Sequence, residues 1–302
     1  MTAITSALRV PGRVLAAPTV GPFLALLLAM AFFSIRSENF LEGQNLSLVL
    51  QQVMVVGVLA IGQTFVILTA GIDPLLAIGL GILACVGFGL LNGGLVTGVK
   101  LPAFIVTLGT LNIAFALTHV YSNDETYSDL PSELLFFGKT FTIGSADFTY
   151  GVVLMFVLYG IAWYALTQTA WGRHVYAVGD NLEAARLMGI KVNRVLLSVY
   201  VLAGLTYGIA AMLLVARTEL GDPNAGQTTE NLDAITAVVL GGTSLFGGRG
   251  SVIGTLIGAV VVGVFRNGLT LIGVEVVWQY FVTGVLVILA VAVDQLTHRS
   301  RA

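Results

Sequence analysis

The glycine-rich segment at residues 93–100 has the spacing of a nucleotide-binding loop. It reads GGLVTGVK, with Gly93 and Gly98 at the positions of the two glycines of a P-loop. A P-loop also needs a lysine directly after the second glycine to reach the phosphates, and Val99 stands there instead. The segment therefore cannot cradle a nucleotide in the usual way. If ATP drives this protein, another subunit must bind it.

The sequence contains no other arrangement typical of catalysis or metal binding. It has no G-x-S-x-G motif, and its three histidines are far apart, without the spacing of an H-E-x-x-H site. Cys85 is the single cysteine and lies in an apolar run, which excludes a disulfide framework and a cysteine-based metal site. We therefore expect neither an enzyme nor a bound metal or cofactor.

The composition is that of an integral membrane protein. Of 302 residues, 57% are hydrophobic and only 10% are charged, and the mean hydropathy is +0.94. In soluble domains roughly a quarter of the residues are charged. The formal net charge is −2, with no dense cluster of Lys and Arg. A lipid bilayer is therefore the expected environment, and binding of DNA or RNA is excluded.

The apolar runs predict an all-α, polytopic bundle of about eight or nine spans, forming a single transmembrane domain over residues 1–302. A spanning helix needs about 20 mostly apolar residues. The candidates are 18–34, 47–70, 75–97, 102–121, 150–169, 195–216, 252–272 and 277–293, with a weaker ninth at 231–247. The glycines and hydroxyls of the ninth suggest a broken or re-entrant segment near 238–250, with a sharp turn at Gly247, Gly248 and Gly250.

The charges of the loops predict their sides of the membrane, since cytoplasmic loops carry the excess of Lys and Arg. Residues 171–194 contain four Arg or Lys residues, so we place this loop in the cytoplasm. Residues 122–148 contain five acids against Lys139, so this loop should face outward. From Lys100 to the C-terminus the predicted sides alternate consistently.

The sequence DNLEAARLMGI at 180–190 predicts a short helix inside the cytoplasmic loop. Asn181 can cap its N-terminus, Glu183 lies in the first turn where the helix dipole favours an acid, and Gly189 can end it. Small and apolar side chains would give this helix a docking surface: Ala184, Ala185, Leu187 and Met188. A loop helix that only packs on the membrane surface is the alternative.

Several segments resemble the permeases of bacterial ABC importers. Glu183-Ala184-Ala185, followed after three residues by Gly189, resembles the EAA loop that contacts the ATPase in that family. Residues 60–73, 91–110, 172–190 and 232–294 are similar to ribose-type, or monosaccharide, permeases, and most of all to fructose-type permeases. The resemblance extends over most of the chain from about residue 45 to 294.

The resemblance implies a translocation subunit for a monosaccharide, with fructose or a ribose-like sugar as cargo, in the bacterial inner membrane. It implies a second permease copy, two cytoplasmic ABC ATPase subunits and a periplasmic sugar-binding protein. The residues expected to contact the ATPase are Asn181, Glu183, Ala184, Ala185, Arg186 and Gly189.

A sugar path needs amide and hydroxyl groups and flat aromatic faces at depth. Alternatively, such polar groups only bond neighbouring helices. Arg266 lies inside an apolar run and either has a functional role or extends to the interface. The candidates for the path are Gln63, Asn92, Thr107, Thr110, Asn112, Asn267, Trp278 and Gln279.

The junction of Asp73 and Pro74 departs from the family pattern. Asp73 can cap the next span, with Pro74 at its first helical position. Ribose-type permeases continue here into a further span of about 25 to 30 residues that has no counterpart in this chain. A shortened, transport-impaired permease with a structural or regulatory role is therefore one alternative. An ion-coupled transporter is another, with Asp73 as its candidate carboxylate. The loss of one span also leaves the side of the N-terminus open.

Overall fold

The computed structural model describes residues 20–54, 81–126, 128, 135–227, 230–245 and 247–299. We call its helical residues 43–54 the bridging helix. The other elements are α2 (Val20–Arg36), η1 (Glu38–Leu41), α4 (Gly81–Gly94), η2 (Leu95–Val99, a π-helix), α5 (Ala103–Ser122), η3 (Phe136–Gly138), β1 (Thr140–Ile143), β2 (Ala146–Thr149), α6 (Tyr150–Gln168), α7 (Ala170–Asp180), α8 (Leu182–Leu187), α9 (Val192–Thr218), η4 (Pro223–Gln227), α10 (Glu230–Leu240), α11 (Val252–Leu271) and α12 (Val276–Arg299).

The predicted all-α membrane bundle is confirmed. Among the described residues, five helical segments are long and apolar enough to cross a membrane: Ile82–Val99, Ala103–Val120, Tyr150–Gln168, Val192–Thr218 and Val252–Leu271. Phe23–Arg36 and Val276–Leu289 are shorter apolar helices. Much of the predicted span 47–70 and the start of span 75–97 lie outside the described residues, as do Gln63 and the Asp73-Pro74 junction.

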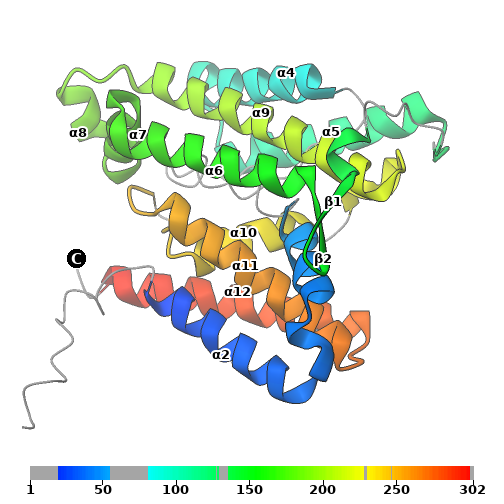
Figure 1. Cartoon of the computed structure of the whole chain (residues 1–302). Coiled ribbons are helices and arrows are strands. Elements are labelled where there is room, and N and C mark those ends of the chain that lie inside the picture. The colour runs from blue at the N-terminus through cyan, green and yellow to red at the C-terminus, as the bar shows by residue number, and fades with distance from the viewer. Residues whose placement is uncertain are drawn as a thin grey trace, which may run out of the picture.

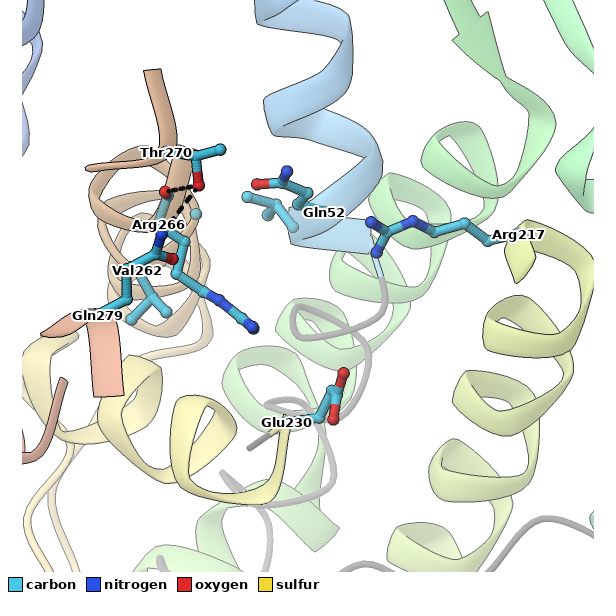
Figure 2. Close-up of a pocket in the computed structure, with 9 residues that line it drawn as sticks. Gln52, Arg217, Glu230, Val262, Arg266, Thr270 and Gln279 are labelled. Atoms are coloured by element: carbon cyan, nitrogen blue, oxygen red, sulfur yellow. Dashed lines mark hydrogen bonds between the residues drawn. The ribbon is translucent and has the colours of Figure 1, made fainter. Parts of the chain in front are cut away.

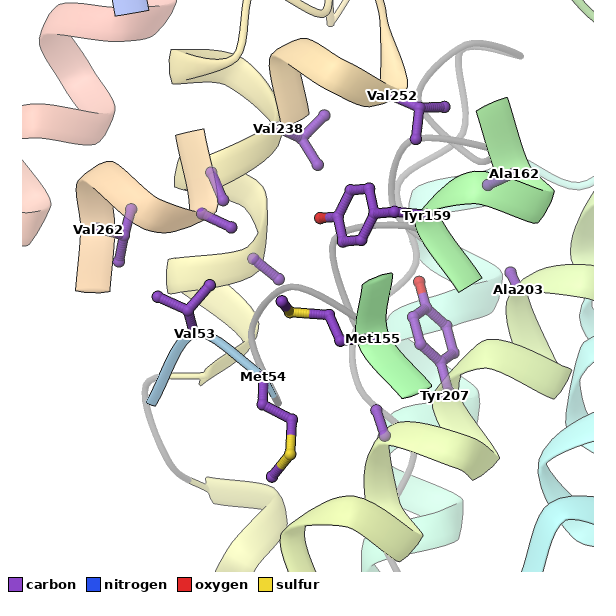
Figure 3. Close-up of a cluster of buried hydrophobic side chains, with 14 of the residues drawn as sticks. Val53, Met54, Met155, Tyr159, Ala162, Ala203, Tyr207, Val238, Val252 and Val262 are labelled. Carbon is purple, nitrogen blue, oxygen red and sulfur yellow. The ribbon is translucent and has the colours of Figure 1, made fainter. Parts of the chain in front are cut away.

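The helices form two layers (Figure 1). One layer holds α4, α5, α6 and α9, and the other holds α2, α10, α11 and α12. The bridging helix joins them, because Val53 packs on Gly263 of α11 while Met54 accepts a hydrogen bond from Thr149, next to α6. Buried apolar side chains of both layers meet here, among them Met155, Val238 and Val262, together with the tyrosines Tyr159 and Tyr207 (Figure 3).

The helix ends gather at two opposite ends of the molecule. At one end lie α7 and α8, and we call it the coupling end; the antiparallel pair of β1 and β2 marks the other, the hairpin end (Figure 1). The bridging helix starts at the hairpin end, where Gln44 bonds Asp147. The hairpin lies within the loop predicted at 122–148 and was not expected from the sequence.

The directions of α4 and α9 follow from their contacts. α9 runs from the coupling end to the hairpin end, and α4 lies antiparallel to it, since Ile82 faces Gly208 whereas Gly93 faces Leu197. α4 therefore ends at the coupling end, where Asn193 bonds the carbonyl of Thr97.

α4 and α9 pack through glycines. A Cβ added at Gly89 would collide with the backbone carbonyl oxygen of Tyr200, and one at Gly204 with that of Cys85. Small residues let helix backbones approach closely in membranes, where dispersion contacts replace the hydrophobic effect between helices. The two backbones are therefore in direct contact.

The segment between α10 and α11 is not helical where the structure describes it. α10 ends at Leu240, and α11 starts at Val252 after Ser251, whose hydroxyl accepts from the backbone N–H of Gly254. Gly248 has a φ of +71° and lies against Asp180, so a side chain there would be strained and would collide with the end of α7. The helix thus breaks inside the stretch expected to be broken.

Candidate functional site

The loop expected at 171–194 is built from two helices. Thr169 caps α7 by accepting a hydrogen bond from the N–H of Gly172 at 3.1 Å. Asn181 caps α8 by accepting from the N–H of Ala184 at 2.9 Å. The helix starting at Asn181 was predicted, but α7 was missed, although Thr169 before an apolar series at Trp171, Val175 and Val178 is a helix signal.

α8 presents apolar side chains away from the body of the protein. Leu187 is 89% exposed and Met188 69% exposed, while Ala185 is fully buried beneath them. Glu183 and Arg186 form an exposed ion pair at 3.0 Å. Gly189 follows with a φ of +82°, a conformation that favours glycine and ends the helix. Two large apolar side chains therefore protrude at the coupling end.

Side-chain hydrogen bonds tie α7 to two other elements. Tyr176 donates to the carbonyl oxygen of Gly250 at 2.9 Å, and Trp171 donates to the hydroxyl of Ser198 at 2.8 Å. Burial raises the pKa of Tyr176, so its hydroxyl keeps the proton that it donates. These two hydrogen bonds therefore link α7 to the broken segment before α11 and to α9.

A polar cavity of about 180 Å³ lies between the layers, away from the coupling end (Figure 2). The bridging helix, α9, α10, α11 and α12 contribute to its wall. Its lining residues are Gln52, Val53, Arg217, Glu230, Val262, Gly263, Arg266, Thr270 and Gln279.

Arg266, on the wall of this cavity, belongs to an ion pair. Arg266 of α11 lies 2.5 Å from the carboxylate of Asp233 of α10, whose side chain is only 1% exposed. Removing a carboxylate from water is costly unless it is paired, and Arg266 supplies the pairing charge. The structure therefore gives Arg266 a partner within the protein rather than at the interface, and its functional role stays a prediction.

The path candidates do not converge on one place. Asn92 of α4 accepts a hydrogen bond from Thr110 of α5 at 2.8 Å, and Thr107 is buried one turn before Thr110. Asn267 exchanges hydrogen bonds of 3.1 Å with Asn45, between α11 and the bridging helix. Asn92, Thr110 and Asn267 therefore bond neighbouring helices, which is the alternative role considered for them.

The other described path candidates lie apart. Gln279 is 8% exposed and lines the cavity, where its amide donates to Thr270 at 3.2 Å and to the carbonyl of Val274 at 3.0 Å. Asn112 is exposed and bonds the carbonyl of Leu108 in its own helix. Trp278 is 59% exposed. Of the described candidates, only Gln279 lines the cavity.

Four polar residues at or next to the cavity were not among the predicted site residues: Asp233, Arg217, Glu230 and Gln52. A signal for Asp233 was present, because this acid stands in the apolar run 231–247, next to the run that contains Arg266. An acid and an arginine in adjacent apolar runs are candidates for a buried pair. Arg217, Glu230 and Gln52 lie near run ends and carry no such signal.

Comparisons with known proteins agree on one family. The family described as branched-chain amino acid transport system / permease component matches residues 37–291. The fructose import permease protein of Rhizobium meliloti is 45% identical over 317 positions, covering 94% of this chain and 87% of the relative. The ribose import permease protein of Bacillus subtilis is 40% identical, covering 91% and 92%. The xylose transport system permease protein of Escherichia coli K12 is 30% identical, covering 91% of each chain.

No solved structure matches the chain. The alignment with the fructose permease is longer, at 317 positions, than the 302 residues of this chain, so the relative has residues without a counterpart here. The matched family is one of non-catalytic inner-membrane subunits that work with a separate ATPase and a periplasmic binding protein. With 45% identity over 94% of its length, the chain belongs to this family of ABC transporter permeases.

Proposed function

We propose that this chain is the translocation subunit of an ABC importer for a monosaccharide, with fructose as the first candidate. The observation that carries the proposal is the 45% identity to a fructose import permease over 94% of the chain. The ribose and xylose permeases among the relatives support the broader class of monosaccharides. Asp233, a buried carboxylate that could have served ion coupling, is paired with Arg266.

In this proposal the coupling end faces the cytoplasm and the hairpin end faces the periplasm. The charge excess of residues 171–194 supports this orientation, because Lys and Arg favour the cytoplasmic side. Residues 122–148, rich in acids, then face the periplasm and the sugar-binding protein. α2 runs toward the hairpin end, since Phe33 packs on Gly268 near the end of α11, and its N-terminal end is therefore cytoplasmic.

The proposed ATPase contact is the exposed surface of α8 and the turn after it. Leu187 and Met188 are large apolar side chains exposed to water in this orientation, and burying each in an interface would contribute about 1.5–3 kcal/mol. Asn181, Glu183, Arg186 and Gly189 shape the helix that carries them. A second permease copy completes the proposed assembly.

Replacing Leu187 and Met188 by aspartate is expected to weaken ATPase binding. Each replacement removes apolar burial and adds a charge that must be desolvated, so affinity should fall at least roughly tenfold for each. The measurement is co-purification and the affinity of the ATPase for the permease in nanodiscs. Ile143→Asp is the matched control, because Ile143 is 62% exposed at the hairpin end. If the two α8 variants and the Ile143→Asp control all bind the ATPase equally well, the proposal that Leu187 and Met188 contact the ATPase is wrong.

Uptake of radiolabelled sugar tests the cargo. The permease is expressed with its ATPase and binding protein in a strain without fructose uptake, and fructose, ribose and xylose are compared. We expect uptake of fructose that requires the ATPase. Unlabelled fructose should compete with it more strongly than the other sugars do. Preferential uptake of ribose or xylose would assign that sugar, instead of fructose, as the cargo. No uptake of any monosaccharide by an assembled complex would instead favour the shortened, transport-impaired permease.

A further inference from the structure

We propose that the cavity between the two layers is a binding site for one neutral, hydroxyl-rich ligand, a monosaccharide, within a single permease subunit. The choice of a monosaccharide rests on the proposed function, whereas the neutral and polar character of the ligand rests on the cavity itself.

The charges around the cavity balance. Arg217 and Arg266 contribute two positive charges, and Glu230 and the Asp233 paired with Arg266 contribute two negative charges. Arg217, Glu230 and Arg266 stand on the wall itself, and Asp233 behind it offsets the charge of Arg266, so neither an anion nor a cation is favoured by a net field. A neutral ligand does not depend on such a field.

Two buried acceptors on the wall lack partners. Among the described residues, Oε1 of Gln52 and Oε2 of Glu230 are buried atoms without a hydrogen-bond partner. Buried polar atoms are nearly always satisfied, by protein, water or ligand. Both residues line the cavity, and Figure 2 shows them on different sides of it. Hydroxyl groups of a ligand can donate to both.

The wall also holds donors for the oxygen atoms of a sugar. The guanidinium groups of Arg217 and Arg266 carry five N–H donors each in a planar fork, and the pairing with Asp233 uses only part of those of Arg266. Gln279 donates to Thr270, which fixes its amide plane at the wall. Because a hydroxyl both donates and accepts, a sugar fits this mixture better than an apolar solute does.

The size and position of the cavity suit a small solute. One water needs about 10–15 Å³ of cavity, and this cavity of about 180 Å³ is roughly ten times larger. Its donors and acceptors come from both layers, with Arg217 on α9, Gln52 on the bridging helix and Arg266 on α11. A bound ligand would therefore contact both layers at once.

The test is direct binding of sugars to the purified permease in nanodiscs, without ATPase or binding protein. Saturation-transfer NMR and titration calorimetry with fructose are expected to show binding that ribose competes and fructose 6-phosphate does not. Gln52→Leu and Thr270→Val should each weaken fructose binding at least fivefold. The matched controls Gln168→Leu and Thr167→Val, exposed near the coupling end of α6, should bind as the wild type does.

The outcomes separate this inference from the proposed function. If the complete complex imports fructose but the isolated permease binds no sugar, or binds it equally well in all four variants, the cavity site is wrong and the importer stands. If the isolated permease binds fructose in the cavity but the assembled complex does not import it, the importer is wrong and the site stands. Stronger binding of the phosphorylated sugar would overturn the neutral character of the ligand. Size-exclusion profiles exclude misfolding as the cause of any loss.

Discussion

Gly89→Val is expected to separate α4 from α9 and to destabilise the permease by about 3 kcal/mol or more. The added side chain meets the backbone carbonyl of Tyr200, which cannot move aside as a flexible side chain could. Overpacking a well-packed site costs about 1–3 kcal/mol, and more where the backbone must shift. The measurement is the unfolding midpoint of the purified protein, followed by tryptophan fluorescence, together with the yield of monodisperse protein.

Gly87→Val is the matched control for this experiment. Gly87 lies on the same helix, two residues away, and a Cβ there would meet no atom of the described structure within 4 Å. The helix propensity of the two variants is identical, so the difference between them reports the contact with α9. Equal unfolding midpoints for the two variants would show that α4 and α9 do not touch at Gly89.

Arg266→Met is expected to destabilise the permease more than Asp233→Leu does. Without Arg266, the carboxylate of Asp233 remains at 1% exposure with no partner charge. Removing one partner of a buried pair costs about 3–5 kcal/mol. Arg266 is 34% exposed and borders the cavity, so it can reach water when Asp233 is removed. Unfolding midpoints of the two variants in the same detergent give the comparison.

The double variant Asp233→Leu/Arg266→Met completes the cycle. Apolar residues of similar volume in place of a buried pair are often neutral or stabilising. The double variant should therefore regain most of the stability that Arg266→Met loses. If the effects of the single variants simply add, the two residues do not interact, and the ion pair makes no contribution to stability.

The sequence was most informative where structure is set locally. The cap at Asn181, the end of α8 at Gly189 and the break before Gly250 each depend on residues a few positions apart. The apolar runs predicted the class of the fold because a bilayer requires long apolar helices. Local sequence also contained the signal for α7, which follows the cap Thr169. The segment was nevertheless predicted to be a loop, because its basic residues are typical of cytoplasmic loops.

The cavity could not be predicted because its residues are far apart in the sequence. Arg266 and its partner Asp233 are 33 positions apart, and Arg217 and Arg266 belong to different layers. Many polar side chains stand in apolar runs, and the sequence does not show which of them lie close together in the fold. Asn92 and Thr110 illustrate the difficulty, since the same residue types that could bind a sugar bond each other between α4 and α5.

The glycine contact between α4 and α9 also has a mechanical meaning. Backbone contact leaves little room for one helix to shift against the other, so we expect α4 and α9 to move together. The boundary between the layers is different, because side chains form it, among them Val53 and Met54 of the bridging helix, rather than touching backbones. If this permease opens alternately to the two sides of the membrane, we expect the layers to move at that boundary rather than α4 to move against α9.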